Sequence, residues 1–266
     1  MPDLSQVDET CLPTSTANLI LWFGKHGYPK MIMAGDTDED RTNHTLHTIM
    51  ADTDARFDWG TRMDMVTVGI KKYITDAGYN CDVEYRGLEG KTPFTPDWLN
   101  ENDESNKGFI LLLAYCHYNE GTQTFSNAWN AGHAVTLVNI EPDMLLIHDP
   151  AHDDDETGRK ILTPQVLTYG MWKDERENVP VSGLMLLSGS LLEAPPDAGV
   201  MLVGAVCITM RPDGLPTMVA SSGAPNGTIA GTAPGDASST PAAPTAAPAA
   251  ESKSWVMLLF DYLFEK

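Results

Sequence analysis

A cysteine near the start of the chain has neighbours that suit a nucleophile. Cys11 follows Gln6 by five residues and comes just before Pro13, which is tolerated at a helix start because its missing N–H would have no partner there. An apolar stripe from Pro13 predicts a helix that ends at Gly24 or Gly27. A thiol in the first turn of a helix faces the positive end of the helix dipole, which favours the thiolate. Most unpaired cysteines are small buried core residues, so this stretch alone leaves both interpretations open.

Residues 131–150 predict a β-hairpin that brings a histidine and an aspartate together. Two apolar strands flank a three-residue turn. This register puts His133 opposite Ala151 and makes Asp149 its diagonal neighbour on the same face, because side chains alternate with period two. Asn139 shares the parity of His133 but lies near the turn, too far away to orient the imidazole.

Gln6, Cys11, His133 and Asp149 make up the candidate catalytic site. A cysteine nucleophile needs a base that takes the thiol proton and a third group that orients the base, and His133 and Asp149 suit these roles. The developing oxyanion needs hydrogen-bond donors, which the Gln6 side-chain amide and the backbone N–H of Cys11 would supply. The four residues therefore predict acyl transfer through a covalent intermediate on Cys11.

Hydrophobic periodicity predicts the elements that position these residues. Helices are expected around 42–51, between Thr61 and Gly78, from Thr95, and from Leu162 towards Trp172. Strands are expected at 80–85, 109–115, 182–192 and 199–210. The segments 120–129 and 151–158 are expected to be polar loops.

The other cysteines do not indicate a metal site or a disulfide framework. Cys81, Cys116 and Cys207 form no CxxC pair with one another or with Cys11, and all four are widely spaced. Cys116 and Cys207 lie in apolar runs and are expected to be buried, whereas Cys81 lies in a turn-like segment and is expected to be exposed.

Two other patterns resemble metal ligands, and neither is specific. His44 and His47 are three residues apart but have no third ligand at a clear spacing. Asp36, Asp38 and Asp40 alternate as in a calcium loop, without the glycine and terminal glutamate that an EF-hand needs. We therefore expect surface histidines and a solvated acidic segment, with no metal and no cofactor.

The charge of the chain limits its partners. The 266 residues carry a formal net charge of −20, which repels nucleic acid and anionic membranes. No apolar run reaches the length needed to span a membrane, and no signal peptide opens the chain as written. A cytoplasmic location is expected, or an exported one if Met1 heads a processed mature chain.

The composition changes sharply after about Thr217. Residues 1–217 are expected to form one domain, and residues 218–251, rich in Ala, Pro, Gly, Ser and Thr, a disordered linker. Residues 252–266 predict a short helix with one apolar face. A helix on a long tether must bury that face by folding back on its own domain, by docking on a protein partner or by forming an oligomer. The long tether favours docking on a protein partner.

The motifs around the candidate site resemble those of papain-like cysteine peptidases, and more closely the bacterial C39-like (double-glycine-peptidase-like) branch. Gln6…Cys11-Leu-Pro-Thr-Ser-Thr-Ala-Asn is similar to the family's Gln…Cys-Gly-Pro-Thr-Ser-Ala-Ala-x, and Gly132-His133-Ala-Val and Asp149-Pro150 are similar to its Gly-His-x-Val and Asp-Pro. The resemblance implies an α+β fold with a helical half packed on a small antiparallel β-sheet and the active site in the cleft between them. Leu12 departs from the family, which has glycine there, and could crowd the cleft.

The expected function is hydrolysis of peptide bonds in a peptide or protein substrate by a Cys11–His133–Asp149 triad with Gln6 in the oxyanion hole. Two alternatives remain open. The domain could be catalytically silent and bind a partner through its C-terminal helix, or the same triad could serve an amidase or acyl transferase, because one site geometry serves several reactions.

Overall fold

A computed structural model of the chain describes most of the first 211 residues. The described residues are 1, 4–6, 9–56, 60–88, 94–100, 106–141, 143–151, 159–173, 178–188 and 198–211. The predicted linker 218–251 and C-terminal helix 252–266 lie outside them, as does nearly all of the predicted acidic loop 151–158. No helix in the described part of the chain is long and apolar enough to cross a membrane.

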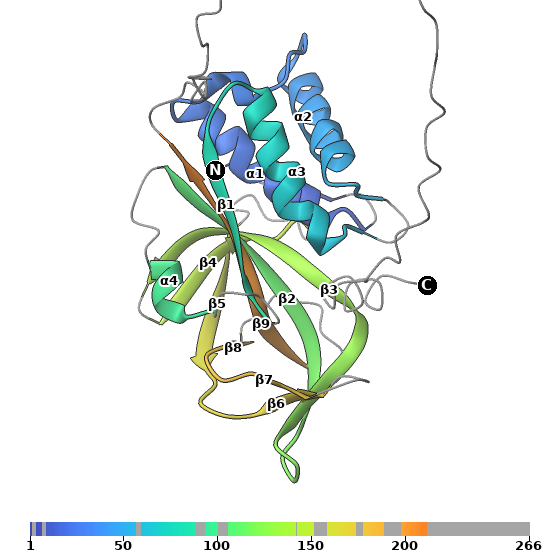
Figure 1. Ribbon diagram of the computed structural model, residues 1–266, viewed down its shortest axis with the longest axis vertical. Helices are drawn as coiled ribbons and strands as arrows, with labels where there is room; N and C mark the ends of the chain where they lie inside the picture. Colours follow the sequence, from blue (N-terminus) through green and yellow to red (C-terminus); the bar gives the residue numbers. More distant parts are fainter. Residues whose placement is uncertain are drawn as a thin grey trace, which may run out of the picture.

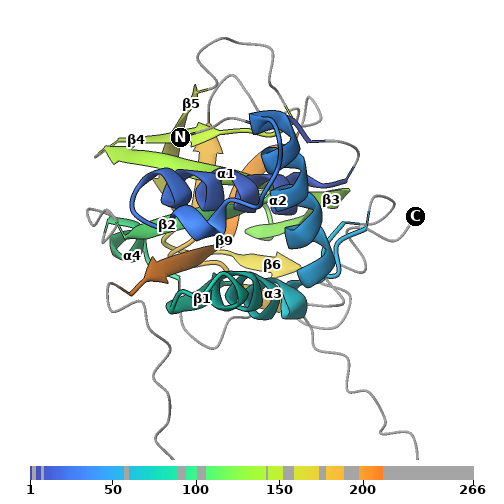
Figure 2. The same ribbon diagram turned by 90° about the horizontal axis from the view of Figure 1, so that it is seen from above.

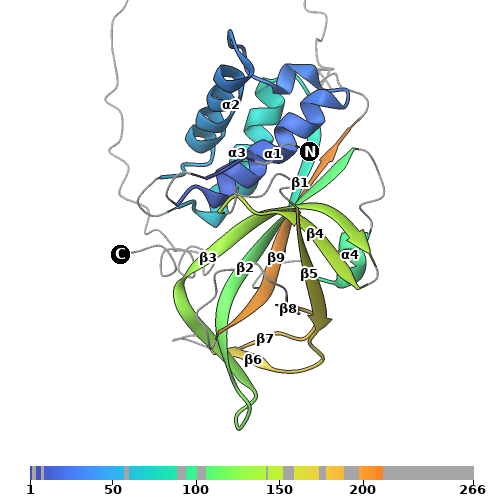
Figure 3. The ribbon, with the colours of Figure 1, turned by 180° about the vertical axis from the view of Figure 1, so that it is seen from behind.

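The described helices are α1 (Cys11–Lys25), the short 3-10 helix η1 (Pro29–Met31), α2 (Asp38–Asp52), α3 (Met63–Asp76) and α4 (Pro96–Asn100). Figures 1 and 3 show α1, α2 and α3 gathered at one end of the molecule, above the strands. Figure 2 looks down on this end, where α1 lies across the strands and α3 lies beside β1. The helices predicted around 42–51, between Thr61 and Gly78, and from Thr95 are confirmed.

The described strands are β1 (Cys81–Gly87), β2 (Lys107–Asn119), β3 (Thr124–Glu141), β4 (Met144–His148), β5 (Arg159–Val166), β6 (Met171–Lys173), β7 (Asn178–Pro180), β8 (Met185–Ser188) and β9 (Gly199–Met210). Six of them close into an antiparallel barrel in the order β2-β3-β4-β5-β8-β9, because β2 pairs with both β3 and β9. Outside the barrel, β1 pairs antiparallel with β9, β6 pairs in parallel with β3, and β7 pairs antiparallel with β6.

The predicted fold class is wrong. The resemblance to papain-like peptidases predicts a helical half packed on a small antiparallel sheet. In the structure, the strands instead form a closed six-stranded barrel with extra strands. β2 decides the difference, since both of its edges are paired along its length. An apolar run such as 109–115 indicates a buried strand, but it does not reveal that the two ends of a sheet meet.

The helix predicted from Leu162 towards Trp172 is also wrong. Residues 159–166 form β5, which pairs with β4 on one side and β8 on the other. Thr163-Pro164 had suggested a helix start, but Pro164 lies beyond the last β4 pair, which joins Leu145 to Leu162. Proline is tolerated there because its missing N–H is not needed by a second neighbouring strand.

Two further predictions need correction. The predicted loop 120–129 is shorter, because β3 begins at Thr124 and pairs with Asn119 at the end of β2. Cys81 is buried in β1 rather than exposed, and this burial raises its pKa to about 11. Cys116 and Cys207 are buried as predicted, and burial raises their pKa values to about 12 and about 11.

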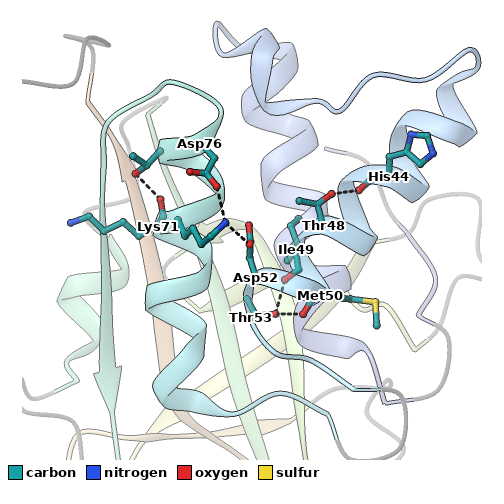
Figure 4. A network of polar contacts seen from close by, with 10 residues as sticks. His44, Thr48, Ile49, Met50, Asp52, Thr53, Lys71 and Asp76 are labelled. Carbon is teal, nitrogen blue, oxygen red and sulfur yellow. Dashed lines mark hydrogen bonds and ion pairs between the residues drawn. The ribbon is translucent and has the colours of Figure 1, made fainter. Parts of the chain in front are cut away.

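Lys72 of α3 joins the end of α2 by an ion pair with Asp52, and the hydroxyl of Thr53 caps that end of α2 (Figure 4). Lys72 Nζ lies 2.8 Å from Asp52 Oδ1 and 2.7 Å from Asp76 Oδ2, and Thr53 Oγ1 donates to the Ile49 carbonyl at 2.7 Å. Gly69 faces this junction, where a Cβ atom would overlap the backbone of Asp52. The contact fixes the position of α3 and of the loop that precedes it.

Candidate active site

Cys11 is the first residue of α1 and is 6% exposed. The first turn contains no acidic residue, and Thr10 makes no side-chain hydrogen bond to the helix backbone. The Thr10 hydroxyl instead pairs with Thr14 Oγ1 at 3.4 Å. Because the first N–H groups of a helix lack partners within the helix, the thiol lies at an end of α1 whose positive charge is not offset by a carboxylate in the first turn.

His133 on β3 contacts Asp149 just after β4. His133 Nε2 lies 2.6 Å from Asp149 Oδ1, and the two side chains are 8% and 1% exposed. The backbone N–H of Ala151 donates to the same oxygen at 3.0 Å. The hairpin thus brings the imidazole and the carboxylate together, as the sequence analysis expected.

The register that joins them depends on a β-bulge. Glu141 pairs with Met144, so the turn has two residues rather than the three expected. If the pairing continued from that turn without a shift, Asp149 would lie opposite Thr136. Its side chain would then project from the face of the hairpin opposite to that of His133. The register shifts by one between Leu137 and Asn139, which brings Asp149 level with Val135 and therefore onto the face of His133.

The environment of His133 favours its charged form. Burial lowers its pKa, but the hydrogen bond that the ring donates to Asp149 and the interactions with Cys11 outweigh burial and raise the pKa to about 10. Since Nε2 faces Asp149, the other ring nitrogen, Nδ1, is the one available to the Cys11 thiol. Imidazolium is therefore the favoured form at neutral pH.

A small cavity opens at Cys11 and His133. About 240 Å³ of empty space lies in it, a figure that includes the open solvent at its mouth. The lining residues are Glu9, Cys11, Leu12, Gly60, Thr61, His133 and Ala134. The start of α1, the loop before α3 and strand β3 therefore meet at this point. Leu12, which replaces the glycine of the resembled family, is 3% exposed and occupies part of the cavity wall.

Gln6 lies beside the acid rather than in the cavity wall. Its backbone N–H donates to the carbonyl of Pro150 at 2.8 Å, which ties the N-terminal segment to the residue after Asp149. The side-chain oxygen Oε1 is buried. Gln6 is not among the described residues that line the cavity.

Three buried polar residues position α1 on β3, and the sequence analysis missed them. Ser15 Oγ donates to the Ala134 carbonyl at 2.9 Å, and Thr136 Oγ1 donates to the Ser15 carbonyl at 3.0 Å. Asn18 Nδ2 reaches Thr136 Oγ1 at 3.5 Å, while Asn18 Oδ1 accepts from the Leu4 N–H at 3.1 Å. Polar residues four and seven positions after Cys11, on one face of an apolar helix, were the signal that could have revealed them.

The two metal-like patterns of the sequence have other partners. Asp40 forms a capping box with Thr37 at the start of α2, and His44 Nδ1 lies 2.7 Å from the Ala34 carbonyl. Within the described ranges, no group of three or more His, Cys, Asp or Glu residues is arranged to hold a metal ion.

The arrangement of Cys11, His133 and Asp149 can support nucleophilic acyl transfer, since each group contacts the next. Comparison with protein-family models, with curated proteins and with solved structures finds no match.

Proposed function

We propose that this chain is a cysteine peptidase. The observation that supports the proposal most is the row of contacts from Cys11, at the start of α1, through the buried ring of His133 to the buried carboxylate of Asp149. A core cysteine needs neither a helix N-terminus nor an imidazole whose second nitrogen is held by an acid. A thiolate nucleophile needs both.

The first half of the reaction forms an acyl-enzyme. In the starting state, the proton of the Cys11 thiol is held by His133 as imidazolium, the form that its raised pKa favours. The thiolate sulfur attacks the carbonyl carbon of a peptide bond. The tetrahedral intermediate collapses as the C–N bond breaks, and the His133 imidazolium gives its proton to the leaving amine. Asp149 holds the ring through Nε2, so that Nδ1 faces the reacting atoms.

The second half releases the acyl group. Water attacks the thioester while His133 accepts one of its protons. The C–S bond then breaks, the carboxylic acid leaves, and Cys11 and His133 return to their starting states. We assign the stabilisation of both oxyanions to the backbone N–H of Cys11 and the side-chain amide of Gln6. The bond from the Gln6 N–H to the Pro150 carbonyl supports this role, because it keeps Gln6 close to the triad.

The substrate is a peptide or a protein segment. Glu9 lines the cavity and is exposed, and the whole chain carries a net charge of −20. Both favour basic side chains near the bond that is cut. The C-terminal segment 252–266 would dock on a protein partner and hold the peptidase close to its target.

The reactivity of Cys11 tests the proposal directly. Iodoacetamide should alkylate Cys11 faster than Cys81, Cys116 or Cys207, because Cys11 lines the cavity beside His133, whereas burial raises the pKa values of the other three thiols. Cleavage of a quenched-fluorescent library of basic peptides should fall at least about a thousandfold in Cys11→Ala and in His133→Ala, since members of a catalytic unit fail together. Equal alkylation of all four cysteines, with unchanged cleavage in Cys11→Ala, would refute the proposal.

One observation favours the second candidate, a catalytically silent binding domain. Leu12 narrows a cavity that is already small, and Cys11 is nearly buried. A silent domain would bind a peptide without cutting it, and its Cys11 would not react with iodoacetamide. An amidase or acyl transferase would share the fast alkylation, and would act on small amides or pass the acyl group to an amine in the same assay.

A further inference from the structure

The loop before α3 puts a buried hydroxyl at the wall of the candidate site. Thr61 is 3% exposed and lines the same cavity as Cys11 and His133. Its Oγ1 is buried and makes no hydrogen bond to any residue that the structure describes. A buried hydroxyl without a partner lowers the stability of the folded state, so this one calls for an explanation.

The loop that carries Thr61 is held in place on both sides. The N–H of Arg56 donates to the Gly60 carbonyl at 2.8 Å, and the N–H of Gly60 donates to the Arg56 carbonyl at 2.9 Å. α3 begins two residues after Thr61 and is joined to α2 through Lys72. Both backbone groups of Gly60 are used, and glycine has no side chain. Among the described residues of this loop, Thr61 is therefore the one that brings a polar side chain to the cavity.

We propose that the Thr61 hydroxyl binds the main chain of the substrate, by donating a hydrogen bond to a peptide carbonyl next to the bond that Cys11 attacks. This inference rests on the proposed peptidase function. A hydroxyl suits this partner because it is uncharged and short, and because every residue of a peptide offers a carbonyl oxygen. The Thr61 hydroxyl then gains its hydrogen-bond partner only when substrate is bound. Thr61 is a substrate-binding residue and takes no part in the proton transfers.

Two probes of Cys11 separate main-chain recognition from thiol reactivity. Iodoacetamide is too small to reach a second subsite, whereas a peptidyl chloromethyl ketone with two peptide bonds offers main-chain carbonyls. The variants are Thr61→Val, which keeps the shape and removes the hydroxyl, and Thr61→Ser, which keeps the hydroxyl. The matched control is Thr53→Val, because Thr53 is also buried but its hydroxyl donates to the Ile49 carbonyl at 2.7 Å.

Thr61→Val should be labelled about tenfold more slowly by the peptidyl ketone, as expected for one lost hydrogen bond. Its rate with iodoacetamide should stay unchanged. Its Tm should be equal to or higher than that of the wild type, because an unpaired buried hydroxyl has been removed. Thr61→Ser should keep most of the peptidyl-ketone rate. Thr53→Val should have a lower Tm and wild-type labelling rates with both probes.

Three outcomes would overturn the inference. Unchanged labelling of Thr61→Val by the peptidyl ketone would show that the hydroxyl does not contact substrate. An equal fall with both probes would show that Thr61 positions Cys11 instead, and a lower Tm like that of Thr53→Val would show a structural hydroxyl. If neither probe labels Cys11 selectively in the wild-type chain, the proposed peptidase function itself fails, and this inference fails with it.

Discussion

Cys11, His133 and Asp149 form a row of contacts in which the two outer groups both act on the pKa of the His133 ring. Asp149 is almost fully buried and lies 2.6 Å from His133 Nε2. A buried carboxylate next to an imidazole favours the imidazolium against the effect of burial, which alone would favour the neutral ring. At the scale of single residues, Asp149 therefore determines the charge of the site at neutral pH.

Replacement of Asp149 by Asn should change how stability depends on pH. The pKa of His133 is raised in the folded state, so its stabilisation is complete below the unfolded value of about 6.5 and is lost as the pH rises to about 10. The stability gap between wild type and Asp149→Asn should therefore shrink over this range. Urea unfolding between pH 5.5 and 10 measures it, and a gap that is constant with pH would contradict the assigned pKa shift.

Leu12 limits access to Cys11. Leu12→Gly should speed the labelling of Cys11 by a bulky peptidyl ketone, because the cavity loses part of its wall. It should also lower the free energy of unfolding by about 2–5 kcal/mol, as large-to-small changes at buried sites do. Leu19→Ala is the control, since Leu19 is buried on the same helix and away from the cavity. Equal labelling of wild type and Leu12→Gly would show that Leu12 does not restrict the site.

At the scale of elements, three segments must meet for the site to exist. These are the N-terminal stretch with Gln6, the start of α1 with Cys11, and β3 with His133. Asn18 connects all three, because its amide accepts from the Leu4 N–H and donates to Thr136 on β3. The chain thus uses one fully buried side chain in the middle of α1 to align groups at the end of that helix.

Asn18→Ala should therefore affect both stability and reactivity. Loss of the amide leaves the Leu4 N–H and the Thr136 hydroxyl with fewer partners, which should cost about 1–3 kcal/mol of unfolding free energy. The labelling of Cys11 by iodoacetamide should slow, because α1 is less well aligned with β3. Asn43→Ala on the exposed face of α2 is the control. A stability loss without any change in labelling would limit Asn18 to a structural role.

At the scale of the whole molecule, all the strands that close the barrel lie before residue 211. β9 ends at Met210, and its partners β1, β2 and β8 all lie earlier in the chain. No strand pair that closes the barrel needs a residue beyond the described part of the chain. The predicted linker and docking helix would then be additions to a finished fold.

A truncation that ends at Ala220 should test this separation. We expect an unchanged Tm and unchanged labelling of Cys11, because the barrel and α1–α3 are complete before that point. Self-association, or binding to the protein partner that the docking helix recognises, should be lost. Size-exclusion chromatography and thermal unfolding measure both properties. An unfolded truncation product would show instead that residues 252–266 belong to the core.

Local patterns in the sequence determined much of the site. The proline after Cys11 and the apolar stripe predicted α1, and alternation predicted the hairpin that carries His133 and Asp149. These elements can be predicted from sequence because the side-chain periods of helices and strands repeat within a few residues. His133 and Asp149 share one face of the hairpin, as expected, although the turn has one residue fewer than predicted. The bulge after Leu137 shifts the register by one residue and so returns Asp149 to the face of His133.

Tertiary structure alone decided the rest. Pro164 follows a threonine as at many helix starts, yet it lies in β5, where it pairs with Leu187 of β8 just beyond the residues that pair with β4. Closure of the barrel through β2, burial of Cys81 under neighbouring elements, and the meeting of Thr61 with Cys11 all join residues that are distant in the chain. Such contacts depend on which surfaces are complementary in space, and no short-range period in the sequence encodes that.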